Sequence, residues 1–212
     1  VEAVDIEGTA LGTGTEKFTV NKDNFAGIRL LDGTTYDTTY TGEKMTVYWG
    51  GTNQHVANTA WFGYSEAAEI GGIKCRKILA AHEKTDGSGG WINGQRISLR
   101  FDDTLQNLIG AEPRNAKIRI CYYDNGTDGI RVCYISNTDR NKTVNIQKED
   151  TNTWKWYELD VTDLINASPA DTSANNGLQD EKTNFAVWGK TKEESNESDT
   201  DTYIAEIQLI LE

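Results

Sequence analysis

Alternation of apolar and polar residues is the strongest signal in this sequence, and it is clearest in residues 117–136. Ile118, Ile120 and Tyr122 alternate with residues that are polar or small, and the pattern resumes at Ile130. Successive side chains of a β-strand point to opposite faces, so this pattern predicts two strands that each have one apolar face. We expect that apolar face to lie in the core.

The segment between these two strands, residues 124–129, reads Asp-Asn-Gly-Thr-Asp-Gly. Such residues tolerate positive φ angles and favour tight turns, so the segment predicts a β-hairpin. In the register that places Tyr122 opposite Val132, Cys121 lies directly opposite Cys133, with their Cα atoms about 4.5–5.5 Å apart. Whether these two thiols are oxidised depends on the compartment in which the protein resides.

The same period of two recurs along the chain and predicts further strands. It is found in residues 45–49, 71–78, 96–101, 143–146, 154–161, 185–188 and 203–211. Residues 105–109 instead suggest a short helix. Roughly ten short strands predict an all-β fold, a two-sheet antiparallel β-sandwich of the jelly-roll type. The length suits one core, so we expect a single domain over residues 1–212.

Composition and charge narrow the possible partners. Twenty glycines, against two prolines and one methionine, suit many short strands joined by turns. The formal net charge of −12 repels nucleic acid and anionic membranes. No apolar run approaches the roughly 18 residues that a membrane-spanning helix needs, and no signal-peptide pattern opens the chain. We expect a monomeric module of a longer, multimodular secreted enzyme, acting outside the cell. The alternative is a cytoplasmic protein.

Six segments of residues 68–212 resemble one group of β-jelly-rolls. They read GGIKCR (71–76), RISLRFDD (96–103), KIRICYYDNGTDGIRVCY (117–134), NTWKWYELDV (152–161), NFAVW (184–188) and YIAEIQLIL (203–211). The group comprises the carbohydrate-binding modules, and related domains of unknown role, that are attached to secreted glycoside hydrolases and polysaccharide lyases. The resemblance implies a jelly-roll fold and sugar binding.

Sugar rings stack on aromatic side chains, so a sugar site needs aromatic rings that point to solvent. Trp156 is the best candidate, because Tyr157, Leu159 and Val161 occupy the inward positions of its strand. The alternative is that a loop or Trp154 covers its ring. The full set of aromatic candidates is Trp156, Trp91, Tyr48 and Tyr123. Trp91 follows a glycine-rich loop, where a ring serves either as a core anchor or as a ligand platform.

Four arginines at outward strand positions form a second set of candidates. A guanidinium group donates paired hydrogen bonds to sugar hydroxyls or to the carboxylate of a uronate. The alternative is that these arginines pair with carboxylates such as Glu158 and Asp160 on neighbouring strands. The four residues are Arg96, Arg100, Arg119 and Arg131.

The sequence gives weaker signals for a structural calcium ion and for a catalytic site than for sugar binding. Related jelly-rolls often hold Ca²⁺ where the N-terminal and last strands meet, and hard oxygen ligands suit that ion. The candidate ligands here are Glu2, Asp5, Glu7 and Glu206, which would otherwise be ordinary surface acids. A glycosidase needs two carboxylates across a cleft, and 33 acidic residues do not single out such a pair.

The function expected from the sequence is therefore a non-catalytic module that targets a plant cell-wall degrading enzyme to β-glucan or hemicellulose. Alternatives are a polysaccharide-cleaving lyase or glycosidase, a module that binds an acidic polysaccharide such as pectin, and a domain that contacts other proteins. The net charge of −12 favours a neutral ligand over an anionic one.

Overall fold

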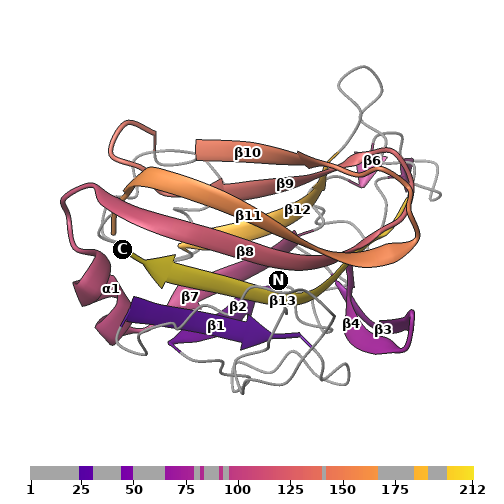
Figure 1. Cartoon of the computed structure of the whole chain (residues 1–212), viewed down its shortest axis with the longest axis horizontal. Helices are drawn as coiled ribbons and strands as arrows, with labels where there is room; N and C mark the ends of the chain where they lie inside the picture. Colours follow the sequence, from indigo (N-terminus) through magenta and orange to yellow (C-terminus); the bar gives the residue numbers. More distant parts are fainter. Residues whose placement is uncertain are drawn as a thin grey trace, which may run out of the picture.

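The computed structural model describes residues 24–30, 44–49, 65–78, 82–83, 91–92, 96–139, 142–166, 184–190 and 200–212. These residues form strands and one short helix (Figure 1). The strands are β1 (Phe25–Arg29), β2 (Met45–Trp49), β3 (Glu66–Ile70), β4 (Ile73–Ile78), β5 (His82–Glu83), β6 (Trp91–Ile92), β7 (Arg96–Phe101), β8 (Arg114–Asp124), β9 (Gly129–Tyr134), β10 (Lys142–Gln147), β11 (Thr153–Leu164), β12 (Phe185–Lys190) and β13 (Thr202–Leu211). The helix is α1 (Asp103–Ile109).

The strands form two antiparallel sheets, which confirms the predicted all-β sandwich. One sheet has the order β11-β8-β13-β4-β3, with β1 paired to β13, and the other has the order β10-β9-β12-β7-β2. Strands β5 and β6 pair separately. Figure 1 looks onto the six-stranded sheet, whose strands β11, β8, β13 and β1 cross the front of the molecule.

The core lies between the two sheets and follows the alternation of the sequence. Ile118, Ile120 and Tyr122 of β8 are buried in it, as are Val132 and Tyr134 of β9, which confirms the predicted apolar faces. Buried side chains of this kind each stabilise the fold by about 1.5–3 kcal/mol, so the alternation fixes which side of every strand points inward.

The helix α1 covers one end of the sandwich (Figure 1). Asp102 caps its N-terminus by accepting a hydrogen bond from the Leu105 backbone N–H at 2.7 Å. Leu105 and Ile109 are its buried residues, and its presence confirms the short helix predicted at residues 105–109. Among the described residues, no helix has the length and apolar character needed to cross a membrane.

The predicted hairpin at residues 124–129 is wrong, because β8 and β9 belong to different sheets. Strand β8 pairs with β11 and β13, whereas β9 pairs with β10 and β12. A two-residue hairpin turn of type I′ needs positive φ at both central residues, and within 124–129 only Gly126 has one, at 74°. The segment therefore carries the chain from one sheet to the other.

The predicted pairing of Cys121 with Cys133 is wrong for the same reason. Cys121 lies opposite Trp156 and Glu206, and Cys133 lies opposite Thr143 and Ala186, on the outer faces of different sheets. Both thiols are buried, and neither forms a disulfide.

Strands β8 to β11 form one long β-ribbon that is folded over between the two sheets. Its closed end pairs Tyr134 with Lys142 in the five-stranded sheet, and its open end pairs Arg114 with Leu164 in the six-stranded sheet. Both arms pass between the sheets at the same level, through residues 125–128 and 148–152. We call this crossing the ribbon bend.

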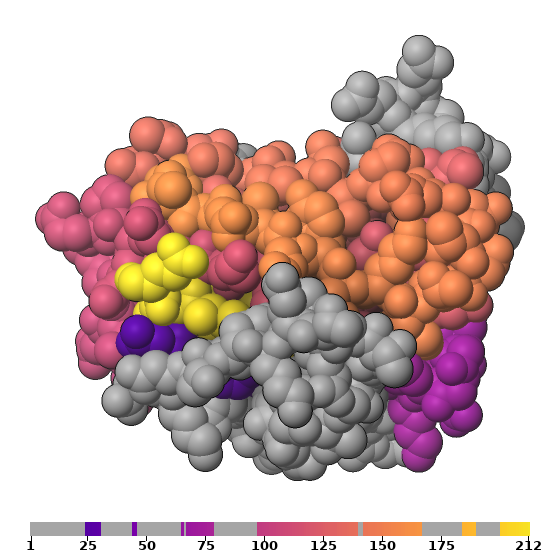
Figure 2. All heavy atoms as spheres, viewed as in Figure 1, coloured from indigo at the N-terminus to yellow at the C-terminus, as the bar shows by residue number. Residues whose placement is uncertain are grey.

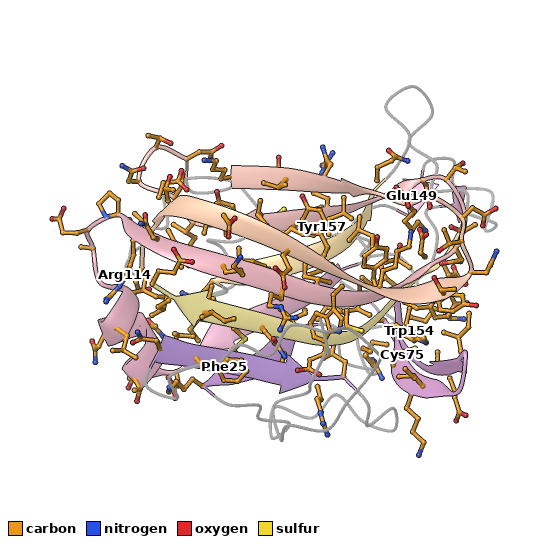
Figure 3. The ribbon with its side chains drawn as sticks, viewed as in Figure 1. Phe25, Cys75, Arg114, Glu149, Trp154 and Tyr157 are labelled. Carbon is orange, nitrogen blue, oxygen red and sulfur yellow. The ribbon has the colours of Figure 1, made fainter. Side chains whose placement is uncertain are left out.

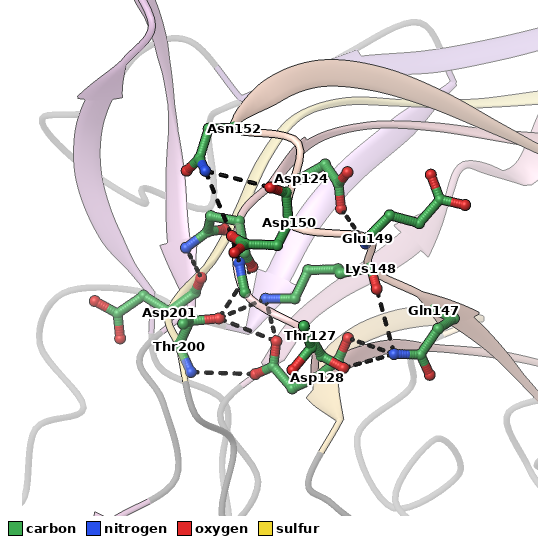
Figure 4. A network of polar contacts seen from close by, with 12 residues as sticks. Asp124, Thr127, Asp128, Gln147, Lys148, Glu149, Asp150, Asn152, Thr200 and Asp201 are labelled. Carbon is green, nitrogen blue, oxygen red and sulfur yellow. Dashed lines mark hydrogen bonds and ion pairs between the residues drawn. The ribbon is translucent and has the colours of Figure 1, made fainter.

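A buried ion pair fills the ribbon bend. Lys148 and Asp128 are fully buried and paired to each other (Figure 4). Lys148 Nζ also donates a hydrogen bond to Thr200 Oγ1 at 2.8 Å, and the Thr200 backbone N–H donates to Asp128 Oδ2 at 3.2 Å. Gly126 leaves room for Thr200, because a Cβ atom at this glycine would lie 2.5 Å from Thr200 Oγ1. These contacts fasten the start of β13 to the ribbon bend.

Asp124 holds the second arm of the ribbon bend. Its buried carboxylate accepts hydrogen bonds from the Glu149 backbone N–H at 2.7 Å, from Thr151 Oγ1 at 2.6 Å and from Lys155 Nζ at 2.7 Å. Burial alone would raise the pKa of Asp124, but the hydrogen bonds from Lys155, Thr151 and the backbone outweigh it and hold the pKa well below its usual range. The carboxylate therefore acts as an ionised anchor at neutral pH.

Candidate functional site

The eight ligand-binding residues predicted from the sequence lie in several parts of the structure. Trp156, Tyr123 and Arg119 share the outer face of the six-stranded sheet, whereas Arg100 and Arg131 occupy outward positions of the five-stranded sheet. Tyr48, Trp91 and Arg96 belong to β2, β6 and β7, and their side chains lie outside the described part of the structure. The outer face with Trp156 is called the Trp156 face below.

Strand β11 forms an edge of the Trp156 face and presents its residues as the alternation predicted. Tyr157 and Leu159 pack against the core, whereas Trp154 and Trp156 join an outer cluster with Cys121. Residues of β11 form a continuous orange band across the upper part of this face in Figure 2. The predicted outward orientation of Trp156 is therefore confirmed, and its side chain is half-buried.

A chain of aromatic rings follows Trp154 across this face. Trp154 meets Tyr123 edge-on at 5.5 Å between ring centroids, and Tyr123 meets Tyr203 edge-on at 6.4 Å. The indole N–H of Trp154 donates a hydrogen bond to the Ile70 carbonyl at 3.1 Å. Figure 3 shows Trp154 beside Cys75, where β3 and β4 meet. These contacts give Trp154 and Tyr123 a structural role, since both rings hold the turn between β3 and β4.

The turn between β3 and β4 offers a test of that role. Gly71 has φ of 57°, and a Cβ atom there would lie 3.0 Å from Trp154 Nε1, whereas Gly72 has φ of 76° with open space around it. Both substitutions by alanine cost about 1–2 kcal/mol of backbone strain. We expect Gly71→Ala to destabilise the protein more than Gly72→Ala in urea unfolding, because it also displaces Trp154. Equal losses would show that Trp154 does not hold the turn.

Arg119 fixes the position of Trp156. Its guanidinium carbon lies 4.6 Å from the centroid of the Trp156 ring, in a cation–π contact. Arg119 is 2% exposed, and it donates hydrogen bonds to Glu158 Oε1 and to Gln208 Oε1, each at 2.8 Å. For this arginine the structure therefore confirms the alternative, in which it pairs with a neighbouring carboxylate. Its role is to orient the tryptophan.

The remaining charges of the Trp156 face are also paired. Lys117 lies 3.0 Å from Asp160 and 3.7 Å from Glu158, and the hydrogen bond with Asp160 is the main cause of a raised pKa for this lysine. Glu206 is buried, lies 3.9 Å from Arg29 Nε and accepts a hydrogen bond from Gln208. Among the described carboxylates of this face, each has a cationic partner.

The two thiols of the outer cluster, Cys75 and Cys121, are unreactive at neutral pH. Burial raises the pKa of Cys75 to about 12, and burial also raises the pKa of Cys121 far above its usual value. Because the thiolate is the nucleophile and the metal ligand, both cysteines act as small apolar residues at neutral pH.

The predicted calcium site can be followed only at Glu206. Glu2, Asp5 and Glu7 lie outside the described residues, and the carboxylate of Glu206 lies 3.9 Å from Nε of Arg29. Within the part of the chain that the structure describes, no group of three His, Cys, Asp or Glu side chains is arranged to hold a metal ion. Calcium binding remains a prediction of the sequence.

The five-stranded sheet presents a second outer face that the sequence interpretation did not single out. In its register Asn145, Arg131 and Trp188 lie side by side on β10, β9 and β12. Trp188 is half-buried and packs against the cluster of Cys133 and Ala186. The signal was present, because Phe185 and Val187 of β12 point inward and leave Trp188 pointing outward.

No protein-family model matches the chain, and no curated protein matches it in sequence. Solved structures overlap with its fold. A carbohydrate-binding module of a Cellvibrio mixtus lichenase, solved with cellotriose, is 12% identical, with a TM-score of 0.29 over 63% of this chain and 95% of the module. The Arthrobacter globiformis isomalto-dextranase, solved with panose, is 12% identical, with a TM-score of 0.37 over 78% of this chain and 23% of the enzyme.

The Listeria monocytogenes cycloalternan-forming enzyme, solved with a pentasaccharide substrate, is 13% identical, with a TM-score of 0.36 over 70% of this chain and 11% of the enzyme. The chain thus spans between 11% and 23% of the length of these two enzymes. The overlapping structures include carbohydrate-binding modules, the group that the sequence resembles. At these low TM-scores, none of them assigns a ligand or a reaction to this chain.

Proposed function

We propose that this protein is a non-catalytic module that binds a neutral β-linked polysaccharide, such as a β-glucan, at the Trp156 face. In this role it serves a longer secreted enzyme that degrades plant cell walls. The observation that carries the proposal is the half-buried Trp156 ring, held in place by the buried guanidinium of Arg119 at 4.6 Å.

A fixed ring favours sugar binding for a thermodynamic reason. Ordering a mobile side chain on binding costs about 0.5–1.5 kcal/mol, and Arg119 has already fixed the Trp156 ring in the free protein. The exposed residues Glu158 and Asp160 follow on the same side of β11, where their oxygens can accept hydrogen bonds from sugar hydroxyls. An apolar ring with a few aimed polar groups is the general form of a ligand site.

The pairing of the charges supports binding over catalysis. A glycosidase places two carboxylates across a scissile bond, one of them as a proton donor. The described carboxylates of the Trp156 face instead contact Arg119, Lys117 and Arg29. A rival enzymatic function predicts release of reducing sugar from a polysaccharide panel, and such release would exclude the non-catalytic proposal.

Trp156→Ala tests the proposed site directly. Truncating a stacked ring costs on the order of 2 kcal/mol or more at a binding hot spot, so we expect affinity for soluble β-glucan to fall about 30-fold. Isothermal titration and affinity electrophoresis measure this change. Tyr157→Ala is the matched control, because it truncates a half-buried ring of the same strand on the opposite side. Undiminished binding by Trp156→Ala would place the site elsewhere.

A further inference from the structure

Arg131 differs from Arg119 in the hydrogen-bond partners of its guanidinium group. Arg131 is half-buried on the outer face of the five-stranded sheet, and its Nε atom is buried without a hydrogen-bond partner. Among the described residues, no hydrogen bond or ion pair engages this guanidinium. A buried donor without a partner is costly, and in a native protein it calls for an explanation such as a bound ligand.

The described strands around Arg131 carry no acidic residue at their outward positions. None of the outward positions of the described strands β10, β9, β12, β7 and β2 is an aspartate or a glutamate. The same positions include Arg100 and Arg131, and the register places Arg96 beside Trp188 on β7. The Trp156 face is different, because it includes Glu158, Asp160 and Glu206. In a protein with a net charge of −12, the described strands of this face thus contribute arginines and no carboxylates.

The neighbours of Arg131 suit a sugar. Cross-strand partners have Cβ atoms about 4.5–5.5 Å apart, so Arg131 stands between the half-buried Trp188 ring and the exposed Asn145 amide. The next row of the sheet has Thr143 exposed, whereas Cys133 and Ala186 are buried in a cluster against which Trp188 packs. A ring, a hydroxyl and an amide around one guanidinium match the groups of a pyranose that bears a carboxylate.

We propose that the outer face of the five-stranded sheet is a second binding surface, and that it takes a carboxylate-bearing sugar, a uronate of an acidic polysaccharide. The Arg131 guanidinium pairs with the carboxylate, Trp188 stacks on the ring, and Asn145 and Thr143 bond to hydroxyls. This surface lies on the opposite side of the sandwich from the Trp156 face, so binding at each of the two surfaces can be tested independently of the other.

Arg131→Met tests the second surface with polygalacturonate as the probe. Removing a charge-assisted pair lowers affinity at least about tenfold, and we expect that loss by isothermal titration. Methyl-esterified polygalacturonate, which lacks the free carboxylate, should bind the wild type at least about tenfold more weakly than the acid. Lys74→Met is the matched control, since Lys74 is an exposed lysine of β4 and its loss changes the net charge equally.

Thermal unfolding without ligand separates binding from structure. Because the Arg131 Nε atom lacks a partner, we expect the Tm of Arg131→Met to equal or exceed that of the wild type. β-Glucan binding by this variant should stay unchanged, whatever the fate of the Trp156 proposal. The proposal is overturned if the wild-type protein does not bind polygalacturonate or binds polyglutamate equally well. It is also overturned if Arg131→Met binds polygalacturonate with undiminished affinity, or if its weaker binding is accompanied by a lower Tm.

Discussion

Replacing Lys148 with methionine is expected to lower the free energy of unfolding by about 3–5 kcal/mol, because the change leaves a buried charge without its partner. Lys148 and Asp128 are both fully buried in the ribbon bend, and Thr200 bonds to each of them. Methionine preserves most of the volume of lysine, so the loss reports the charge rather than a cavity. Urea unfolding monitored by tryptophan fluorescence measures the change.

Two further variants make this result specific. Lys142→Met removes an ion pair with Asp163 from a side chain that is 41% exposed, so it should lower the free energy of unfolding far less than Lys148→Met does. The double variant Lys148→Met and Asp128→Asn should recover part of the stability, since it leaves no buried charge. If Lys148→Met were as mild as Lys142→Met, water would have to reach the ribbon bend.

Asp124→Asn is expected to destabilise the protein by about 2–4 kcal/mol at pH 7, because a buried carboxylate loses its charge-assisted hydrogen bonds. The lowered pKa of Asp124 also makes this loss depend on pH. An aspartate with a lower pKa in the folded state stabilises the fold above its unfolded pKa of about 3.9, and that contribution disappears as the pH falls. The difference in free energy of unfolding between the wild type and Asp124→Asn should therefore narrow by about 1 kcal/mol from pH 7 to pH 3.

Asp160→Asn provides the comparison for this pH experiment. Asp160 is 75% exposed and pairs with Lys117 at the surface, so its loss should change stability by less than about 1 kcal/mol at either pH. If the difference in free energy of unfolding between the wild type and Asp124→Asn stayed constant with pH, the Asp124 carboxylate would not be the group that titrates.

The alternation of the sequence was sufficient to predict which way side chains point. It placed Ile118 and Ile120 in the core and Trp156 on the outer face, and all three predictions are confirmed. Alternation does not reveal which strand lies beside which, because the alternating pattern of a strand is the same whichever strands flank it. The turn signal at residues 124–129 was therefore interpreted as a hairpin, although its aspartates serve the ribbon bend.

The candidate site was harder to predict because it depends on pairing between distant strands. The separate roles of Arg119 and Arg131 could not be distinguished in the sequence, since both arginines occupy outward positions near a turn. Arg119 meets Glu158 and Gln208 only because β11 and β13 flank β8. Arg131 instead faces Asn145 and the tryptophan of β12, where no carboxylate follows from the register.

The ribbon of β8 to β11 has a consequence for the order in which the chain folds. Its pairs are nested, so that contact between Tyr134 and Lys142 brings the next pairs together in turn, down to Asp124 and Thr153. Each step closes only a short additional loop, whereas pairing β13 with β4 must close a loop of well over a hundred residues at a greater entropic cost. The ribbon thus brings strands of both sheets together through short loop closures and presents β8 as a template for the C-terminal strand.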